Sequence, residues 1–233
     1  MQKTTTLLKM KLFFRRMLPF IILLAMIGGK INAQPYINGN LSTGATATGG
    51  ATAPTGYTWS EVQAGNNSAG FGANITANLS LADDFIVPAG QGWDITKITF
   101  YAYSTGYAGT TSPFTDVRLK IYNTDPSTGS PTPVYGDFTT NIFSASSDAL
   151  MYRIFNASPG TTRKIWKIEA NVTKSLGPGH YWIEWMHGNG GLSNFSPAST
   201  VVGTTTQPGN NAKQHNITPD TWVNPLVDGA NPQ

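Results

Sequence analysis

The amino-acid sequence predicts an all-β protein: a single antiparallel β-sandwich of jelly-roll-like arrangement that follows an N-terminal signal peptide. Only 12% of the 233 residues are charged. Apolar residues recur in short runs separated by Gly, Pro, Asn and Asp, which is typical of a sandwich or barrel. Several runs alternate apolar and polar residues, as half-buried strands do. After the signal peptide, no window of eleven or more residues has a convincing helical period.

The first 33 residues have the order of a secretory signal peptide. Basic residues between Lys3 and Arg16 precede an apolar run, and the small residue Ala33 stands just before Gln34. An apolar run of about a dozen residues is too short for a bilayer, which needs about 20. We therefore expect cleavage after Ala33, export to the extracellular space or the outer cell surface, and no membrane span in the mature protein.

The rest of the chain divides into a lead-in and one domain. Residues 34–56 are expected to be a flexible lead-in, because Gly39–Gly56 consists almost wholly of Gly, Ala, Thr and Ser. A β-sandwich domain is expected over residues 57–233. Its end, Asn224–Gln233, is turn-like and lacks a closing strand, so either the sheet closes earlier or the chain is a fragment.

Taken in chain order, the apolar runs predict the strands of this domain. In Trp93–Tyr103 the apolar phase changes, which a β-bulge near Thr96–Lys97 explains. Thr115–Asn123 and Ile165–Val172 alternate most cleanly, so each has one buried face and one wet face. The expected strands are Tyr57–Gln63, Ala82–Val87, Trp93–Tyr103, Thr115–Asn123, Val134–Phe138, Leu150–Phe155, Ile165–Val172, His180–Met186, and a weak pair near Ser199–Val202 and Thr221–Val223. The residues expected in the core are Val117, Leu119, Ile121, Trp166, Ile168, Ile183 and Trp185.

The charge of the mature chain excludes nucleic acid as a partner. The whole chain has a formal net charge of +3, but six of its 15 basic residues lie in the first 33 positions. Residues 34–233 keep nine bases against 12 acids, which is a net charge of −3. Nucleic-acid binding needs a basic stripe that neutralises phosphates, and nine scattered bases do not supply one.

No catalytic motif stands on its own in this sequence. The Gly-x-Ser-x-Gly turn of α/β hydrolases is absent. The residues His180, His187 and His215 are too widely spaced for a zinc motif on a helix. Glycoside hydrolysis needs two facing carboxyl groups, and the sequence does not pair the available ones. These acidic residues are Glu61, Asp83, Asp84, Glu169 and Glu184.

Two pairs of residues are candidate binding sites, one acidic pair and one pair of an aromatic and an acidic residue. Adjacent carboxylates such as Asp83 and Asp84 repel each other unless a cation is near, so both are candidate ligands for Ca²⁺, which prefers oxygen. The alternative is that they bond to the backbone on opposite faces of a strand. In Tyr181–Trp185, an inward Ile183 leaves Trp182 beside Glu184 on the outer face. A sugar ring could stack on that indole while the carboxylate accepts its hydroxyls, unless a loop such as 189–211 covers it.

Six segments together resemble a family of uncharacterised secreted bacterial proteins. The resemblance covers about Tyr57–Asp228, and it implies an exported β-sandwich without implying any chemistry. Bacteroidetes members often carry a C-terminal sorting domain for type IX secretion, which we do not expect in this chain. The segments are Tyr57–Gln63, Ala82–Pro88, Ile98–Tyr103, Tyr135–Asp137, Met151–Phe155 and Gly179–Trp185.

The function that the sequence favours is a secreted or cell-surface, non-catalytic binding or adhesion module. Its expected partner is an extracellular glycan or surface polymer, with Trp182 and Glu184 as the binding residues. No cofactor is expected unless Asp83 and Asp84 bind Ca²⁺. Two alternatives remain open at this point: a purely structural surface domain and a secreted glycan hydrolase.

Overall fold

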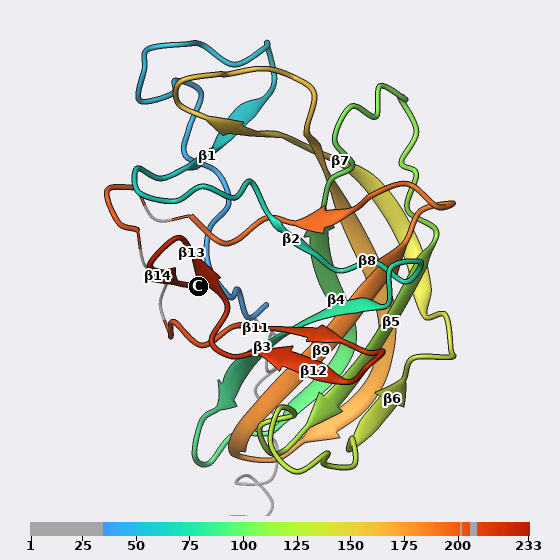
Figure 1. Cartoon of the computed structure of the whole chain (residues 1–233). Coiled ribbons are helices and arrows are strands. Elements are labelled where there is room, and N and C mark those ends of the chain that lie inside the picture. Colours follow the sequence, from blue (N-terminus) through green and yellow to red (C-terminus); the bar gives the residue numbers. More distant parts are fainter. Residues whose placement is uncertain (1–34, 201, 206–208) are drawn as a thin grey trace, which may run out of the picture. The chain divides into compact units, whose positions relative to one another are not determined.

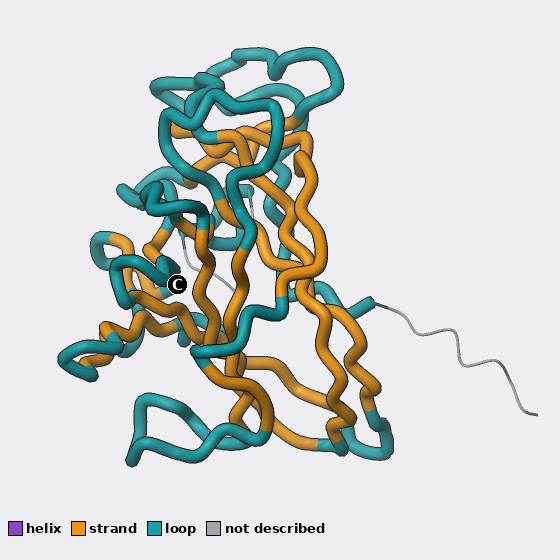
Figure 2. Tube along the Cα trace, turned by 90° about the vertical axis from the view of Figure 1, so that its right-hand side faces the viewer, coloured by secondary structure: helices purple, strands orange, loops and turns teal. Residues whose placement is uncertain are grey.

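The computed structural model describes residues 35–200, 202–205 and 209–233. Their regular secondary structure is entirely β, as Figure 1 and Figure 2 show by arrows and orange strands joined by loops. Residues Asn38–Gln233 form one compact unit. The signal peptide expected over residues 1–33 lies outside the described residues. Within the described part of the chain, no helix is long and apolar enough to cross a membrane.

One of the two large sheets has four strands. In spatial order they are β1 (Thr58–Val62), β7 (Phe143–Phe155), β8 (Lys164–Leu176) and β4 (Trp93–Ala102). β4, β8 and β7 pair antiparallel, whereas β1 runs parallel to β7. The expected bulge in β4 is confirmed, because the register with β8 shifts between Ile95 and Lys97. The sheets are therefore mostly, but not wholly, antiparallel.

The second large sheet has six strands, all paired antiparallel. In spatial order they are β12 (Thr221–Val223), β11 (Lys213–Asn216), β3 (Leu79–Val87), β9 (Gly179–Gly188), β5 (Asp116–Tyr122) and β6 (Tyr135–Asp137). Two further pairs are small. They are β2 (Phe71–Gly72) with β10 (Phe195–Ser196), and β13 (Val227–Asp228) with β14 (Asn231–Pro232).

Both large sheets contribute to one hydrophobic core. The alternation in β5 and β8 predicts this core correctly, since residues of both strands are almost completely buried in it. Ile183 and Trp185 of β9 are half-buried and pack against the same cluster. The buried residues that the sequence predicts are Val117, Leu119, Ile121, Trp166 and Ile168.

Part of the segment 34–56, which was expected to be a flexible lead-in, packs against β1. Ala47 and Ala53 are buried against Trp59, and the Trp59 indole donates to the backbone oxygen of Ala51 at 2.9 Å. Thr48 adds two hydrogen bonds to the buried carboxylate of Glu61, at 2.9 and 3.0 Å. Small side chains suffice here because the large aromatic surface comes from the strand that they cover.

Three strand expectations also differ from the structure. β7 begins at Phe143 rather than Leu150, because its polar first half has no alternating pattern and its register with β8 shifts between Asp148 and Met151. The turn-like C-terminus contains the short β13–β14 pair. No strand is described at 199–200 or 202, and residue 201 lies outside the described residues. The neighbouring strand is instead β10.

Candidate functional site

The outer face of the six-stranded sheet carries Trp182 and Glu184, as the alternation in β9 predicts. Their neighbours Tyr181, Ile183 and Trp185 pack toward the core. However, Trp182 is only 5% exposed and Glu184 is fully buried. The expectation of an open aromatic platform at Trp182 is therefore wrong.

The chain itself covers this ring. Lys213 of β11 is 3% exposed and holds its ammonium 4.8 Å from the centre of the Trp182 ring. The ammonium is fixed there by the Asp125 carboxylate at 3.0 Å and by the Asn224 side-chain oxygen at 2.6 Å. A cation over an indole face is a favourable contact that occupies the position a sugar ring would need. Among the described residues, this cover comes from Lys213 of β11 and from Trp222 of β12.

Glu184 is the centre of a buried polar network. Its carboxylate accepts hydrogen bonds from the Ser80 and Tyr122 hydroxyls at 2.6 and 2.8 Å. His215 Nδ1 lies 2.8 Å from the same carboxylate, and His215 Nε2 lies 2.7 Å from Asp220. Burial opposes the charged imidazole, but the bonds to both carboxylates outweigh it and raise the pKa of His215. A protonated His215 therefore donates to Glu184 and Asp220 at once.

This network joins β11 and β12 to the middle of the sheet. Trp222 of β12 stacks on the His215 ring with centroids 4.1 Å apart and planes 9° from parallel. Burial, followed by the nearby Glu184 carboxylate, raises the pKa of the Tyr122 hydroxyl, which therefore keeps its proton as a donor. Both carboxylate oxygens of Glu184 are thus bonded to side chains of the same domain. We call this set the outer-face network; it comprises Tyr122, Trp182, Glu184, Lys213, His215 and Trp222.

The structure does not bring Asp83 and Asp84 together as a metal site. Asp83 lies opposite Ile183 on the inward side of β3, and Asp84 lies opposite Trp182 on the outer side. Asp83 accepts a hydrogen bond from Asn38 at 2.6 Å, and burial raises its pKa to about 6. Asp84 is bonded to His180. Among the described residues, no three His, Cys, Asp or Glu side chains form a group suited to a metal ion.

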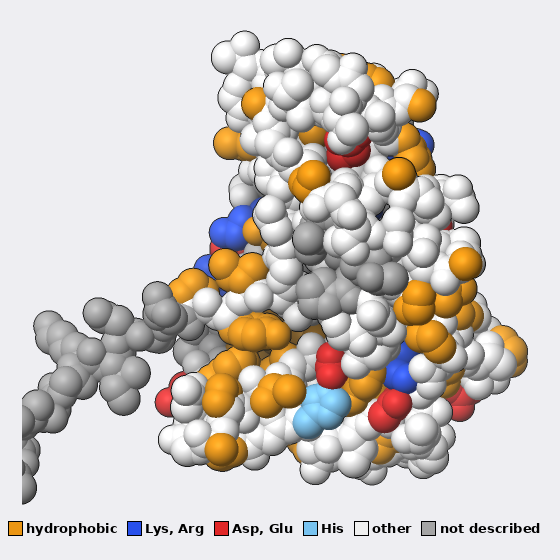
Figure 3. Space-filling view, turned by 90° about the vertical axis from the view of Figure 1, so that its left-hand side faces the viewer, with side chains coloured by type: hydrophobic (Ala, Val, Ile, Leu, Met, Phe, Trp, Pro, Cys, Tyr) orange, Lys and Arg blue, Asp and Glu red, His pale blue; other side chains and the backbone are white. Residues whose placement is uncertain are grey.

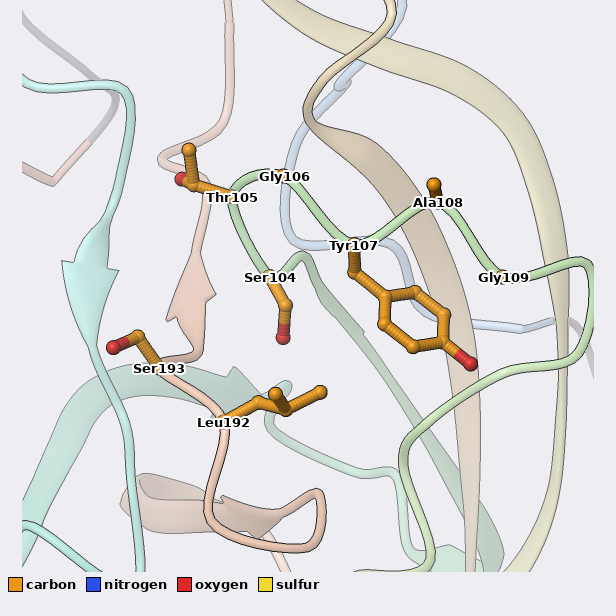
Figure 4. A pocket seen from close by; sticks show the side chains of 8 residues that line it. All are labelled: Ser104, Thr105, Gly106, Tyr107, Ala108, Gly109, Leu192 and Ser193. Carbon is orange, nitrogen blue, oxygen red and sulfur yellow. The ribbon is translucent and has the colours of Figure 1, made fainter.

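A cavity of about 420 Å³ lies between the loop that follows β4 and the loop that follows β9. We call it the loop-end cavity. In Figure 4 the side chains of Ser104, Tyr107 and Leu192 gather on one side of these loops, while Thr105 and Ala108 point away. The lining offers hydroxyls, one aromatic ring and the aliphatic side chains of Ala108 and Leu192. The lining residues are Ser104, Thr105, Gly106, Tyr107, Ala108, Gly109, Leu192 and Ser193.

The two loops are tied together at their bases. Tyr103 and Phe195 exchange two backbone hydrogen bonds, at 2.9 and 3.0 Å, and their rings stack with centroids 5.6 Å apart. Gly106 adopts a φ of 79°, which suits glycine, and its N–H donates to the Thr162 oxygen at 2.7 Å. These contacts fix the bases of the two loops relative to each other.

The Tyr107 ring is held firmly in the cavity wall. Its hydroxyl donates to the Thr111 oxygen at 2.8 Å, and its edge packs on the Trp166 ring with centroids 6.3 Å apart. Gly109 lies against the ring so closely that a Cβ there would overlap it. His187 of β9 lies against the rings of Phe100 and Phe114, and burial lowers its pKa to about 3, so the imidazole is neutral.

Sequence reasoning found only one half of this cavity. The loop 189–211, which was named from the sequence only as a possible cover for Trp182, supplies Leu192 and Ser193. The other half, Ser104–Gly109, was not singled out. The available signal was the aromatic Tyr107 between Gly106 and Gly109, in a segment rich in Ser, Thr and Gly.

No protein-family model, curated protein or solved structure matches this chain. Figure 3 shows one face of the molecule, on which charged side chains are few and scattered among uncharged polar and apolar atoms. A function is therefore inferred from the geometry and chemistry of this chain's own residues.

Proposed function

We propose that the protein is an exported, non-catalytic module that binds a neutral glycan at the cell surface or outside the cell. The observation that carries this proposal is the loop-end cavity. Its Tyr107 ring is held by a hydrogen bond from its hydroxyl to the Thr111 oxygen, and the Ser104 side chain lines the same cavity. A pyranose has apolar faces that stack on aromatic rings and hydroxyls that pair with hydroxyls, so this lining suits it.

The volume and the charge of the cavity support a small neutral ligand. At about 420 Å³ the cavity falls within the roughly 300–1,000 Å³ that ligand sites occupy. Its lining side chains carry no charge. An anionic ligand would lose its hydration there without gaining a cationic partner. We therefore place a neutral sugar above a phosphate or a carboxylate.

A jelly-roll-like sandwich is the arrangement that we infer for the domain. Strands β3 and β4, which follow each other in the chain, pair with β9 and β8, which also follow each other. β5 then adds to β9, and β7 adds to β8. Strands that alternate between two sheets in this way give the Greek-key order of jelly rolls. Export remains part of the proposal through the signal peptide over residues 1–33.

The rival functions are a structural surface domain and a hydrolase. The outer-face network favours the structural reading for that face, since its aromatic and acidic groups serve the fold. A hydrolase would need a carboxyl pair at a ligand site, and the loop-end cavity is lined by hydroxyl, aromatic and aliphatic groups instead. We therefore place binding above both rivals.

A glycan array tests the proposed function. The exported protein is expected to bind a neutral glycan, and Tyr107→Leu should weaken binding about tenfold, the loss of roughly 1.4 kcal/mol of ring stacking. Tyr101→Leu is the matched control, because Tyr101 lies on β4 but does not line the cavity. EDTA should leave binding unchanged. An array without any bound glycan supports the structural rival. Hydrolysis of a glycan by the wild-type protein establishes an enzyme.

Mass spectrometry of the protein from the culture medium tests export. The expected mature chain begins at Gln34. An exported protein that retains Met1–Lys30 would contradict the cleaved signal peptide.

A further inference from the structure

Asn189 holds one wall of the loop-end cavity in place. It directly follows β9, is 4% exposed, and donates from Nδ2 to the Ser104 hydroxyl oxygen at 2.8 Å. The next two residues, Gly190 and Gly191, have φ values of 69° and 90°. The chain therefore reverses after Asn189 and returns to line the cavity. One short turn thus positions both the buried amide and the opposite wall.

The bond from Asn189 decides what the Ser104 hydroxyl can offer to a ligand. A serine hydroxyl has one proton to donate and two lone pairs that accept. The amide N–H of Asn189 uses one lone pair. Among the residues that the structure describes, no acceptor takes the Ser104 proton. Ser104 is only 3% exposed, but it lines the cavity and Figure 4 shows its hydroxyl on the cavity side, so we infer that the proton points to where a ligand acceptor atom would lie.

The orientation of the Asn189 amide follows from the cost of unpaired groups. As observed, Oδ1 is the buried amide atom without a partner among the described residues. A flipped amide would accept the Ser104 proton through Oδ1 and leave Nδ2 buried and unpaired. Unpaired buried N–H groups are rarer than unpaired oxygens. The observed orientation, which keeps Ser104 as a donor, is therefore favoured.

We propose that Asn189 is a positioning residue that presets Ser104 as a hydrogen-bond donor to the ligand. The cavity then recognises an acceptor oxygen of a neutral sugar, a hydroxyl or ring oxygen, while the sugar face rests on Tyr107. This inference rests on the proposed function and adds to it the polarity of the contact at Ser104. A ligand that presents only a donor to Ser104 is disfavoured.

A double-mutant cycle on the exported protein tests this role. The probes are methyl β-D-glucopyranoside, methyl β-D-galactopyranoside and methyl α-D-mannopyranoside, titrated by NMR. In Asn189→Asp the carboxylate only accepts, so it takes the Ser104 proton, and affinity for the tightest probe should fall about tenfold. Ser104→Ala should cost about the same. The double variant should bind no more weakly than Ser104→Ala, because the two residues act through one proton.

Two further variants separate positioning from general destabilisation. Asn189→Ala adds no buried charge and should also weaken binding only when Ser104 is present. Asn194→Ala is the matched control: its amide is 1% exposed and donates to the His187 backbone oxygen rather than to a lining residue. Its affinity should equal that of the wild type.

The outcomes distinguish the two proposals. Two outcomes overturn the role of Asn189 and leave glycan binding intact. In the first, Asn189→Asp binds with the same affinity as the wild type. In the second, Asn189→Asp lowers the affinity as much in the Ser104→Ala background as in the wild type. A wild-type protein that binds none of the three probes and no array glycan overturns the proposed function, and the role of Asn189 with it.

Discussion

Replacing Glu184 by Gln isolates the charge at the centre of the outer-face network. The side chain keeps its size, so the change removes the carboxylate charge without opening a cavity. Glu184 is fully buried and takes bonds from Ser80, Tyr122 and His215, at 2.6, 2.8 and 2.8 Å. Breaking a buried charged pair lowers the free energy of unfolding by about 3–5 kcal/mol. We expect the low end, about 3 kcal/mol, because the amide still bonds to the hydroxyls.

Glu169→Gln provides the matched control on β8. Glu169 pairs with Lys97 and Lys167 at 2.7 Å each, but these lysine side chains are 48% and 40% exposed. Water screens such pairs, so the control should lose less than about 1 kcal/mol. Urea unfolding followed by tryptophan fluorescence measures both free energies. Equal losses in the two variants would refute the reasoning that the buried network stabilises this face.

Three further predictions concern titration and packing. Folding raises the pKa of Asp83 to about 6, so the free energy of unfolding falls as the pH rises from about 4 to 6. Asp83→Asn should therefore be up to about 3 kcal/mol more stable than the wild type at pH 8, but not at pH 3.5. Stabilisation of the wild type by added Ca²⁺ would contradict this. The raised pKa of His215 adds to the free energy of unfolding below about pH 6.5, and this contribution is lost as the pH rises through the pKa of His215 in the folded protein. In His215→Gln, the urea midpoint should therefore change less with pH above pH 6 than in the wild type. Gly109→Ala should displace the Tyr107 ring and weaken glycan binding on the array, with the far-ultraviolet circular dichroism of the sheets unchanged.

Alternation in single strands carried much information about the fold. Val117, Leu119 and Ile121 face the core as their spacing predicts, and the phase change in β4 marks a real bulge. β11 was missed because Lys213 and His215 are polar residues on a buried face, where they meet other polar groups. A pattern of hydrophobic residues does not reveal a strand whose buried face consists of polar residues.

The candidate site could be predicted only in part, for a related reason. The sequence placed Trp182 and Glu184 on the correct face, but their burial depends on Lys213, about thirty residues later, whose position the local pattern does not encode. The loop-end cavity depends on the pairing of Tyr103 with Phe195. Contacts between such distant segments come from the tertiary fold and leave no mark on the spacing of either segment.

The central claim is that a glycan binds at the loop-end cavity while the chain itself covers the ring of Trp182. Amide and indole chemical-shift changes, measured while the exported protein is titrated with the tightest-binding methyl pyranoside, test it most directly. The account predicts the largest shifts at the amides of Gly106, Gly109 and Ser193, with the indole signals of Trp182 and Trp222 unchanged. Shifts at these two indoles, with none at the loop amides, would contradict it.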